Sequence, residues 1–456
     1  MKHSLIPGLA ALLLAWVFLT QTALNRAEGQ IRVATFEVDA SPPIGSPLAY
    51  DPTRGIQDPL SCRGLVILSD QSPIVLCSVD WLGIANDGQK EFRKAFAKAA
   101  GTTPERVAVH TIHQHDAPRC DFSAERLLAE YGDGGKNYDL AFCRSVIRNA
   151  AQAIRQALPR AQNVTHLGLG EGKVIEVASN RRILGENGKV KVTRYTATRD
   201  PKVRAMPVGT IDPLLKSISF WQKEKPLAVL TFYATHPQSY YRTGKASTDF
   251  PGLARNARQK ETGVPHVHFN GAGGNIGAGK WNDGSVANRA VLAGKVERGM
   301  KLAWANTRRT PVNAKSLKWT TTSVRLPIGK TLTESRQLMA LENKKETPSN
   351  RLYAAKHLTW IRRSESGEGV PLACLKINGS KTLFVPGELF VEYQLAAQKM
   401  DEESFVTMAA YGEYGMGYIG TAISYSQGGY ESSPRASRVG PGSEKILLQA
   451  FGKLLQ

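Results

Sequence analysis

Three of the nine histidines in this chain of 456 residues stand within one short segment, His110-Thr111-Ile112-His113-Gln114-His115. The segment begins in an apolar, β-branched run at 107–111 that is typical of a strand, and successive side chains on a strand point to opposite faces. His113 and His115 therefore share a face, where neutral imidazole rings commonly bind metal ions. We predict a metal-binding or catalytic role for this pair; the alternative is a set of hydrogen-bonded structural histidines.

Two further polar residues stand at the ends of predicted buried strands. His236 follows the apolar run 227–234, and Glu388 follows the run 381–385. Catalytic side chains are common where strands end and loops open to solvent. A Gly-rich stretch at 269–277 suits close approach of the backbone to a ligand, or N–H donation to an oxyanion, although a tight turn explains it equally well.

A tyrosine-rich segment near the end of the chain completes the set of chemical candidates. Its members are Tyr411, Tyr414, Tyr418, Tyr425 and Tyr430. Two histidines, a glutamate and a tyrosine form a mixed nitrogen and oxygen ligand set that suits Zn²⁺, an ion that polarises carbonyl groups and lowers the pKa of bound water. The alternative for the tyrosines is an aromatic-rich loop.

The elements that must position these residues alternate between strands and helices. Residues 64–68 and 74–79 are typical of a strand hairpin, whereas 91–100 and 138–158 have helical spacing. This alternation predicts a mixed α/β (α+β) fold. An amphipathic helix is expected over 444–455.

No internal repeat or long linker is evident in the sequence, so we expect one large catalytic domain over residues 29–456. Within it, the polar segment near 331–362 is rich in lysine and arginine. It reads as a solvated helical insertion; the alternative is a dedicated binding arm.

The composition is that of a globular protein, with 42% hydrophobic and 21% charged residues, which excludes disorder, collagen and coiled coil. The formal net charge of +20 favours an anionic partner or contact with an anionic surface. Residues 1–28 contain a short apolar run and predict a signal peptide, and hence a periplasmic or secreted protein; an uncleaved anchor is the alternative. Export and the lack of any nucleic-acid-binding motif disfavour nucleic acid as the partner.

Five cysteines are too few for a disulfide scaffold in a chain of this length, and no CxxC motif suggests a thiolate metal cluster. Cys62 and Cys77 flank the predicted hairpin, and Cys120 could pair with Cys143. The remaining thiol, Cys374, is expected to pack in the core.

Taken in order, these motifs resemble the neutral/alkaline ceramidase family, whose members are zinc-dependent amidases that cleave the N-acyl bond of ceramide. The resemblance begins at 33–45 (VATFEVDASPPIG) and includes Ile112-His113-Gln114-His115-Asp116-Ala117-Pro118, Ala234-Thr235-His236-Pro237 and Pro386-Gly387-Glu388. It implies a ceramidase-like catalytic domain. The zinc ligands that it implies are His113, His236, Glu388 and Tyr425.

The same resemblance assigns further roles around the metal. It implies that His115 stabilises the oxyanion or orients the substrate, and that Asp249 supports the ligands from behind. Asn275 and Tyr430 are the other catalytic candidates. Asn275 lies in the loop Gly273-Gly274-Asn275-Ile276-Gly277, which matches the family's Gly-Asp-x-Ser-Pro loop.

Two departures from the family bear on the activity. The loop at 273–277 lacks the serine that the family uses in amide cleavage. The sequence also ends soon after Tyr425, so we expect no C-terminal immunoglobulin-like domain of the kind that family members carry. A reaction or a substrate other than ceramide cleavage is therefore expected.

Three functions follow from these patterns. The first is a secreted zinc hydrolase that cleaves an amide or ester bond of a lipid-like amide without a serine nucleophile. The second is a metal-dependent lyase or hydrolase of an acidic polysaccharide, in which a Tyr or His abstracts the proton next to a uronate carboxylate. The third is an inactive module that binds an anionic ligand. No oligomeric state is predicted.

Overall fold

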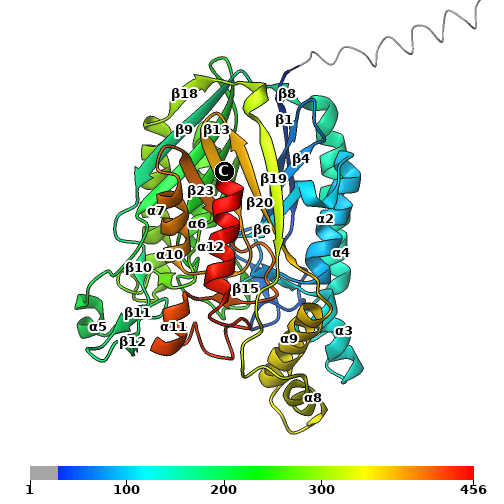
Figure 1. Ribbon diagram of the computed structural model, residues 1–456, viewed down its shortest axis with the longest axis vertical. Helices are drawn as coiled ribbons and strands as arrows, with labels where there is room; N and C mark the ends of the chain where they lie inside the picture. Colours follow the sequence, from blue (N-terminus) through cyan, green and yellow to red (C-terminus); the bar gives the residue numbers. More distant parts are fainter. Residues whose placement is uncertain (1–28) are drawn as a thin grey trace, which may run out of the picture.

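The computed structural model describes residues 29–456; the predicted signal peptide at 1–28 lies outside the described residues. Strands form three main sheets, with helices on their outer faces (Figure 1). The mixed α/β fold expected from the sequence is therefore confirmed. Among the described residues, no helix is both long and apolar enough to cross a membrane.

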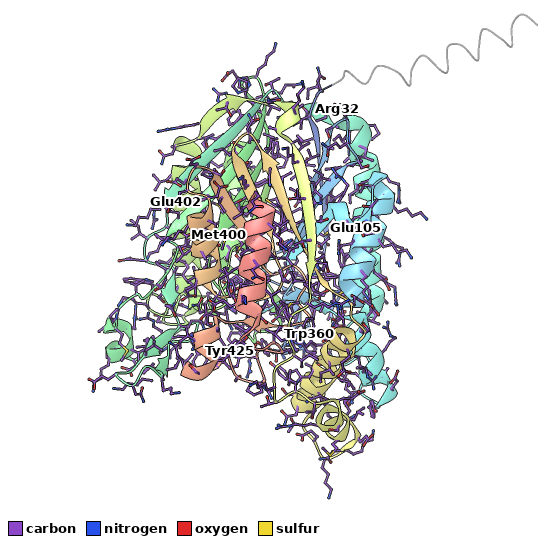
Figure 2. All side chains as sticks on the ribbon, viewed as in Figure 1. Arg32, Glu105, Trp360, Met400, Glu402 and Tyr425 are labelled. Atoms are coloured by element: carbon purple, nitrogen blue, oxygen red, sulfur yellow. The ribbon has the colours of Figure 1, made fainter. Side chains whose placement is uncertain are left out.

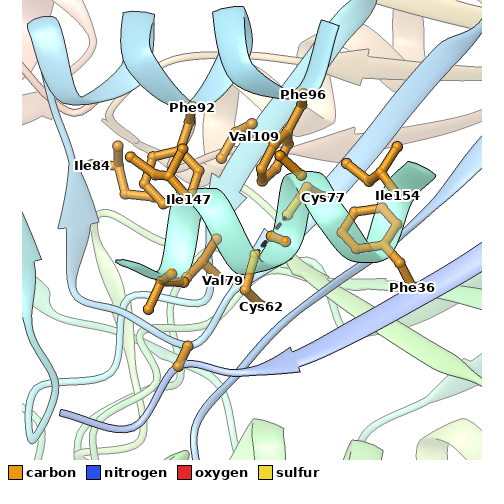
Figure 3. Close-up of a cluster of buried hydrophobic side chains, with 14 of the residues drawn as sticks. Phe36, Cys62, Cys77, Val79, Ile84, Phe92, Phe96, Val109, Ile147 and Ile154 are labelled. Atoms are coloured by element: carbon orange, nitrogen blue, oxygen red, sulfur yellow. Dashed lines mark hydrogen bonds between the residues drawn. The ribbon is translucent and has the colours of Figure 1, made fainter. Parts of the chain in front are cut away.

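The first sheet carries the predicted hairpin. Its strands, in spatial order, are β6 (Val107–Thr111), β4 (Ile74–Val79), β3 (Ser61–Leu68), β1 (Arg32–Asp39) and β8 (Gln162–Asn163). All pairs are antiparallel except β4 with β6. Two amphipathic helices, α2 (Asp87–Ala100) and α4 (Leu140–Ala157), cover its outer face and bury an aromatic cluster that includes Phe36, Phe92 and Phe96 (Figure 3). Burying a side chain of this size contributes about 1.5–3 kcal/mol.

The second sheet repeats this arrangement further along the chain. Its strands, in spatial order, are β16 (His266–Asn270), β14 (Lys225–Tyr233), β13 (Leu214–Gln222), β9 (His166–Lys173) and β18 (Arg308–Pro311). Here β14 and β16 are the parallel pair. The helices α6 (Asp249–Thr262) and α7 (Val286–Ala305) lie together and pack on this sheet.

The third sheet has four strands. In spatial order they are β19 (Lys318–Val324), β20 (Val370–Ile377), β21 (Ser380–Phe384) and β23 (Phe405–Ala409), with β21 and β23 parallel. Helices α10 (Val391–Met400) and α12 (Ser443–Leu455) cover it, and α12 is the expected C-terminal helix. Apolar residues from all three sheets meet in one central core; Leu76, Leu230, Phe269 and Phe384 belong to it.

The three sheets share a structural unit that the sequence does not reveal as a repeat. Each contains an antiparallel hairpin, a covering helix and then a strand parallel to the hairpin's second strand. The three units are β3–β4–α2–β6, β13–β14–α6–β16 and β20–β21–α10–β23. Because the last two strands of each unit are parallel, their carboxyl ends lie at the same sheet edge, where ligand sites of α/β proteins form.

Further elements connect these units. The helices are α3 (Phe122–Glu130), α5 (Pro201–Ala205), α8 (Glu334–Glu342), α9 (Pro348–Glu365) and α11 (Ala422–Gln427). The two-stranded pairs join β2 (Gly55–Ile56) with β15 (Lys245–Ala246), β5 (Gly83–Ile84) with β7 (Arg119–Cys120), β10 (Ser179–Asn180) with β17 (Ile276–Gly277), β11 (Arg182–Leu184) with β12 (Val190–Thr193), and β22 (Glu388–Leu389) with β24 (Tyr418–Ile419).

The helical insertion expected near 331–362 is present as α8 and α9, but α9 is not a solvated helix. Its residues Leu352 and Leu358 pack against α3, and Trp360 enters the core below the third sheet. Lysine and arginine recur along this segment, and α9 buries apolar residues that lie between them. The helix therefore fixes the residues of its inner face relative to the sheets.

All five cysteines are buried as free thiols. The two expected neighbours, Cys62 and Cys77, face each other across the hairpin with their sulfur atoms 3.5 Å apart (Figure 3). Cys120 and Cys143 are likewise adjacent: burial raises the pKa of the Cys120 thiol, and a hydrogen bond with Cys143 raises it further. Cys374 packs in the core of the third sheet, as expected.

Candidate metal centre

The candidate site lies at the carboxyl ends of the parallel strands. His113 and His115 follow β6, His236 follows β14, and Glu388 follows β21. Each of the three units therefore contributes one part of the group. The side chains of His113, His236 and Glu388 are almost completely buried, with at most 2% of their area exposed.

The four polar side chains are close together. His113 Nε2 lies 3.2 Å and His236 Nδ1 3.9 Å from Glu388 Oε2, and the Nε2 atoms of His115 and His236 are 3.1 Å apart. Nitrogen atoms of the three histidines all lie within 4.8 Å of one another. The structure thus brings together three of the four predicted ligands, and adds His115 as a further nitrogen donor.

The backbone after β4 determines which nitrogen of His113 faces the site. His113 adopts a left-handed conformation, with φ of 68°, and its main-chain N–H donates to the Trp81 carbonyl. Its Nδ1 donates to the Leu82 carbonyl at 2.6 Å, so Nε2 is the nitrogen that faces Glu388. A hydrogen bond of this kind on the outer nitrogen is typical of metal-binding histidines.

Glu388 has an oxygen that lacks a normal hydrogen bond. Oε1 accepts a hydrogen bond from Tyr414 Oη at 2.6 Å, whereas buried Oε2 has no hydrogen-bond partner of normal geometry among the described residues. Oε2 faces the free nitrogen of His113, and two such acceptors repel each other unless a cation lies between them. That cation is a second proton on His113 or a metal ion, and the nitrogen and oxygen donors fit zinc.

Local electrostatics keep His115, His236 and Glu388 in the forms that bind metal. Burial, together with His113 and Arg181, lowers the pKa of His236 well below its usual value, and burial with His113 does the same for His115. Burial alone would raise the pKa of Glu388, but the charge and hydrogen bond of His113 outweigh it and lower that pKa. Both histidines are therefore neutral and the glutamate ionised near pH 7.

Several tyrosines enclose the group and contact the predicted ligands. Tyr414 donates to Glu388, and a second contact comes from Tyr418. Its ring stacks on His236 with the centroids 6.3 Å apart, and its hydrogen bond lowers the pKa of Glu388. Its hydroxyl accepts a hydrogen bond from Arg181 at 3.2 Å. Tyr411 stacks on His113 at 4.6 Å, and its buried hydroxyl has no hydrogen-bond partner among the described residues.

The structure does not bring Tyr425, the predicted fourth ligand, to this group. It lies on α11 (Figure 2), and its hydroxyl is 3.0 Å from Ser437 Oγ. Within the same tyrosine-rich segment, the short strand β24 places Tyr418 rather than Tyr425 beside Glu388. Residue spacing alone does not distinguish the two, because β24 is only two residues long and pairs with β22, which begins at Glu388.

Two other predicted residues have structural partners. The side chain of Asn275 donates to Glu392 and accepts from the Val391 N–H, both at 2.8 Å, so it joins the Gly-rich loop to α10 instead of facing the histidines. Asp249 accepts the N–H of Ser239 and lies 3.4 Å from Arg289. It braces the segment after His236 and has no contact with the histidines among the described interactions.

The Gly-rich loop supports the backbone of Glu388. The Gly274 N–H donates to the Leu389 carbonyl, and a Cβ on Gly274 would lie 2.3 Å from the Glu388 carbonyl oxygen. Only glycine permits this contact. The loop that departs from the ceramidase motif therefore holds the backbone of the predicted glutamate ligand.

The remaining predicted residues lie at the edge of the site. His115 Nδ1 lies within hydrogen-bond distance of two side chains, 3.0 Å from Tyr50 Oη and 3.1 Å from Gln238 Nε2. Tyr430 is half-buried and its ring contacts Tyr418 edge-on at 5.7 Å. The sequence did not indicate Tyr50 and Gln238 as site residues, because neither stands in a recognisable motif. The one available signal was that Gln238 stands two residues after His236.

Two substitutions test whether Tyr418, rather than Tyr425, supports the metal centre. We expect Tyr418→Phe to weaken metal retention by about 10- to 100-fold, because it removes the hydroxyl at Glu388, whereas Tyr425→Phe leaves retention unchanged. Competition with a chromogenic chelator measures both. A larger loss of metal from Tyr425→Phe than from Tyr418→Phe would indicate that Tyr425 is the ligand.

The first histidine of the motif, His110, has a separate structural role. Its Nδ1 donates to the Ala410 carbonyl at 2.7 Å, and its ring lines a cavity of about 670 Å³ between α2, β6 and β20. Burial lowers its pKa to about 4. It is therefore neutral at pH 7 and remains so in mildly acid solution.

The buried, neutral state of His110 is expected to make the protein less stable at acid pH. The unfolded chain takes up a proton at this position below about pH 6.5, whereas the folded chain does so only near pH 4, so the free energy of unfolding falls as the pH drops through this window. The loss attributable to His110 is at most about 3 kcal/mol. We expect His110→Asn, whose amide can still donate to Ala410, to flatten the pH dependence of urea unfolding between pH 4 and 6.5; an unchanged slope would contradict this.

Comparison with known proteins places the fold. No protein-family model and no curated protein sequence matches the chain. Among solved structures it is similar to a ceramidase complexed with C2, with a TM-score of 0.67 and 16% identity over 94% of this chain and 75% of that one. It is equally similar to the neutral ceramidase from Pseudomonas aeruginosa, with 74% of that chain covered. Over 94% of its length, the chain therefore has the fold of the neutral ceramidases.

Proposed function

We propose that this protein is a zinc-dependent hydrolase that cleaves an amide or ester bond at the group formed by His113, His236, Glu388 and Tyr418. The observation that carries the proposal is the convergence of buried nitrogen and oxygen donors: the nitrogen atoms of three histidines lie within 4.8 Å of one another, and His113 Nε2 lies 3.2 Å from Glu388 Oε2. The ceramidase-like fold supports amide or ester hydrolysis. Zinc would supply a Lewis acid for the carbonyl group and a nucleophile at neutral pH.

The protein's own residues would bind and orient the substrate. Burial and Glu388 raise the pKa of Tyr411 well above its usual value, so this hydroxyl stays protonated and can donate to a developing oxyanion. His115 is half-buried, neutral and held from behind by Tyr50 and Gln238. It is placed to accept a proton from the attacking water and to pass that proton to the leaving group. No serine takes part in this scheme, which is consistent with the loop at 273–277.

Metal removal and restoration tests the proposal. The purified protein is assayed on N-acyl amides, ceramide and carboxylic esters, then after dialysis against a chelator, and again after addition of zinc. We expect hydrolysis of at least one class, loss of activity in the chelator and recovery with zinc. Activity that persists without metal would overturn the proposal. Absence of both metal and activity would favour a binding module.

A lyase is the second candidate because the site is strongly basic. Arg119 and Arg181 both act on His115 and help to lower its pKa, so the imidazole is neutral and able to accept a proton from carbon next to a uronate carboxylate. The product would contain an unsaturated uronate that absorbs near 235 nm. Appearance of this absorbance without hydrolysis of amides or esters would favour the lyase.

The predicted export and signal peptide remain part of this proposal. A site that acts on an extracellular or periplasmic substrate requires that residues 1–28 direct the chain out of the cytoplasm. Fractionation of cells that express the full chain tests this, and we expect the protein without residues 1–28 to be found outside the cytoplasm.

A further inference from the structure

A group of cations lies beside the metal centre without a carboxylate partner. Arg119, Lys356 and Arg438 form no ion pair within 4.0 Å in residues 29–456. Buried Nε atoms of both arginines also lack a hydrogen-bond partner among these residues. Unpaired charges in such surroundings are costly, and a bound anion would satisfy them. We refer to these three residues as the basic cluster.

The basic cluster is only one side chain away from Glu388. Lys356 Nζ lies 5.7 Å from the ring centroid of Tyr414, whose hydroxyl donates to Glu388, and 5.3 Å from that of Tyr353. Lys356 is on α9, the helix of the insertion that packs on α3 and into the core. Its position relative to the site is therefore fixed by packing.

Electrostatics within the cluster support anion binding. Burial and the charges of Arg438 and Arg119 lower the pKa of Lys356 well below its usual value. The charges of Asp121 and Glu388 raise this pKa, but by less than the other effects lower it. An anion between these cations would favour the charged form of Lys356 and offset their mutual repulsion.

Exposed aromatic rings continue from the basic cluster around His115. Tyr50 and Tyr241 are 42% and 37% exposed, and their ring centroids are 5.1 Å apart. The Arg119 guanidinium lies 5.6 Å and the Arg242 guanidinium 4.9 Å from the Tyr50 ring. Tyrosine rings offer a flat apolar face with a polar edge, and arginine offers paired donors to carboxylate or sulfate. The two together suit a sugar ring that carries an acidic group.

We propose that the substrate of the metal centre is an anionic sugar, whose carboxylate or sulfate binds the basic cluster while its ring packs on Tyr50 and Tyr241. This inference rests on the proposed function for the reaction itself. It also gives a structural role to the net charge of +20. An uncharged lipid amide would leave Arg119 and Lys356 without a counter-charge.

Binding is tested separately from catalysis. Oligogalacturonate and chondroitin sulfate oligosaccharides serve as the carboxylate and sulfate probes, and methyl-esterified oligogalacturonate as the neutral one. Affinities are measured by calorimetry with zinc-free protein at two salt concentrations. We expect at least one acidic probe to bind about tenfold more tightly than the neutral probe, and higher salt to weaken its binding. The two acidic probes show whether carboxylate or sulfate is preferred.

Variants locate the binding. Arg119→Gln and Lys356→Gln should each weaken binding of the acidic probe about tenfold, since each removes a charge-assisted hydrogen bond. Arg148→Gln, which removes an exposed cation on α4, should have no effect. Zinc content of all three variants is measured in parallel and is expected to equal that of the wild type.

Equal affinity for acidic and neutral probes, or unchanged binding by both cluster variants, would overturn this inference. Binding to vesicles of anionic phospholipid but to neither acidic oligosaccharide would also overturn it and assign the cluster to a lipid headgroup. The zinc content distinguishes failure of this inference from failure of the proposed function. A protein that binds acidic sugars but never retains zinc would support the binding site and contradict the proposed reaction.

Discussion

Replacing Glu388 by glutamine is expected to abolish metal binding and to lower activity by about a thousandfold or more. The substitution keeps the size of the side chain but removes the one negative charge that, within residues 29–456, is in direct contact with His113. Oε2, the buried oxygen without a normal hydrogen bond, would become part of a neutral amide. Loss of a metal that contributes several kcal/mol to transition-state stabilisation corresponds to a rate loss of this size.

A neighbouring glutamate provides the matched control. Glu392 on α10 accepts a hydrogen bond from Asn275 at 2.8 Å but does not contact the histidines in the described interactions. Glu392→Gln should keep metal and most activity, with a modest loss of stability. Mass spectrometry of metal content and initial-rate assays on both variants make the comparison. Full activity in Glu388→Gln would contradict the site assignment, as would full activity in His236→Ala.

The second large effect is expected on stability, from Arg255→Met on α6. Arg255 donates to both oxygens of Asp80, at 2.6 and 2.9 Å, and both side chains are completely buried. Burial would raise the pKa of Asp80, but the charge and hydrogen bonds of Arg255 outweigh it, so Asp80 is ionised. Removing one partner leaves an uncompensated buried charge, which costs about 3–5 kcal/mol.

This ion pair also supports the metal centre. Asp80 begins the segment after β4 whose next residues, Trp81 and Leu82, bind His113 through their carbonyl groups. Arg255→Met should therefore lower metal affinity as well as the free energy of unfolding. Urea unfolding and chelator competition measure the two effects.

Arg258→Met on the same helix is the control for the stability effect. Arg258 pairs with Glu261, which is half exposed, so its loss should cost about 1 kcal/mol or less. Equal destabilisation by the Arg255 and Arg258 variants would contradict the importance assigned to the Asp80 pair.

Much of the fold could be predicted from local patterns. The hairpin at 61–79, the helix at 87–100 and the C-terminal helix all follow from hydrophobic period and turn residues. The threefold ββαβ arrangement could not, because the units share no sequence beyond that period, and the parallel pairing of β4 with β6 is formed between distant parts of the chain. The burial of α9 was also missed, because its recurring lysine and arginine residues indicated a solvent-exposed helix.

The candidate site was predictable where residues follow strand ends directly. His113, His236 and Glu388 each stand two to four residues after a buried strand, and the parallel pairing then brings them together. The sequence indicated Tyr425 rather than Tyr418 as the neighbour of Glu388. The position of Tyr418 depends on the pairing of β22 with β24, and each of these strands has only two residues. The tertiary partners of Asn275 likewise leave no signal in the local sequence.

The most direct test of a zinc site is the metal content of the purified protein. Inductively coupled plasma mass spectrometry is applied to the wild type and to His236→Ala after incubation with equimolar zinc and removal of free metal. We predict about one zinc per wild-type chain and none in the variant. A wild-type protein that retains no zinc, or a variant that retains as much as the wild type, would contradict the proposed metal centre.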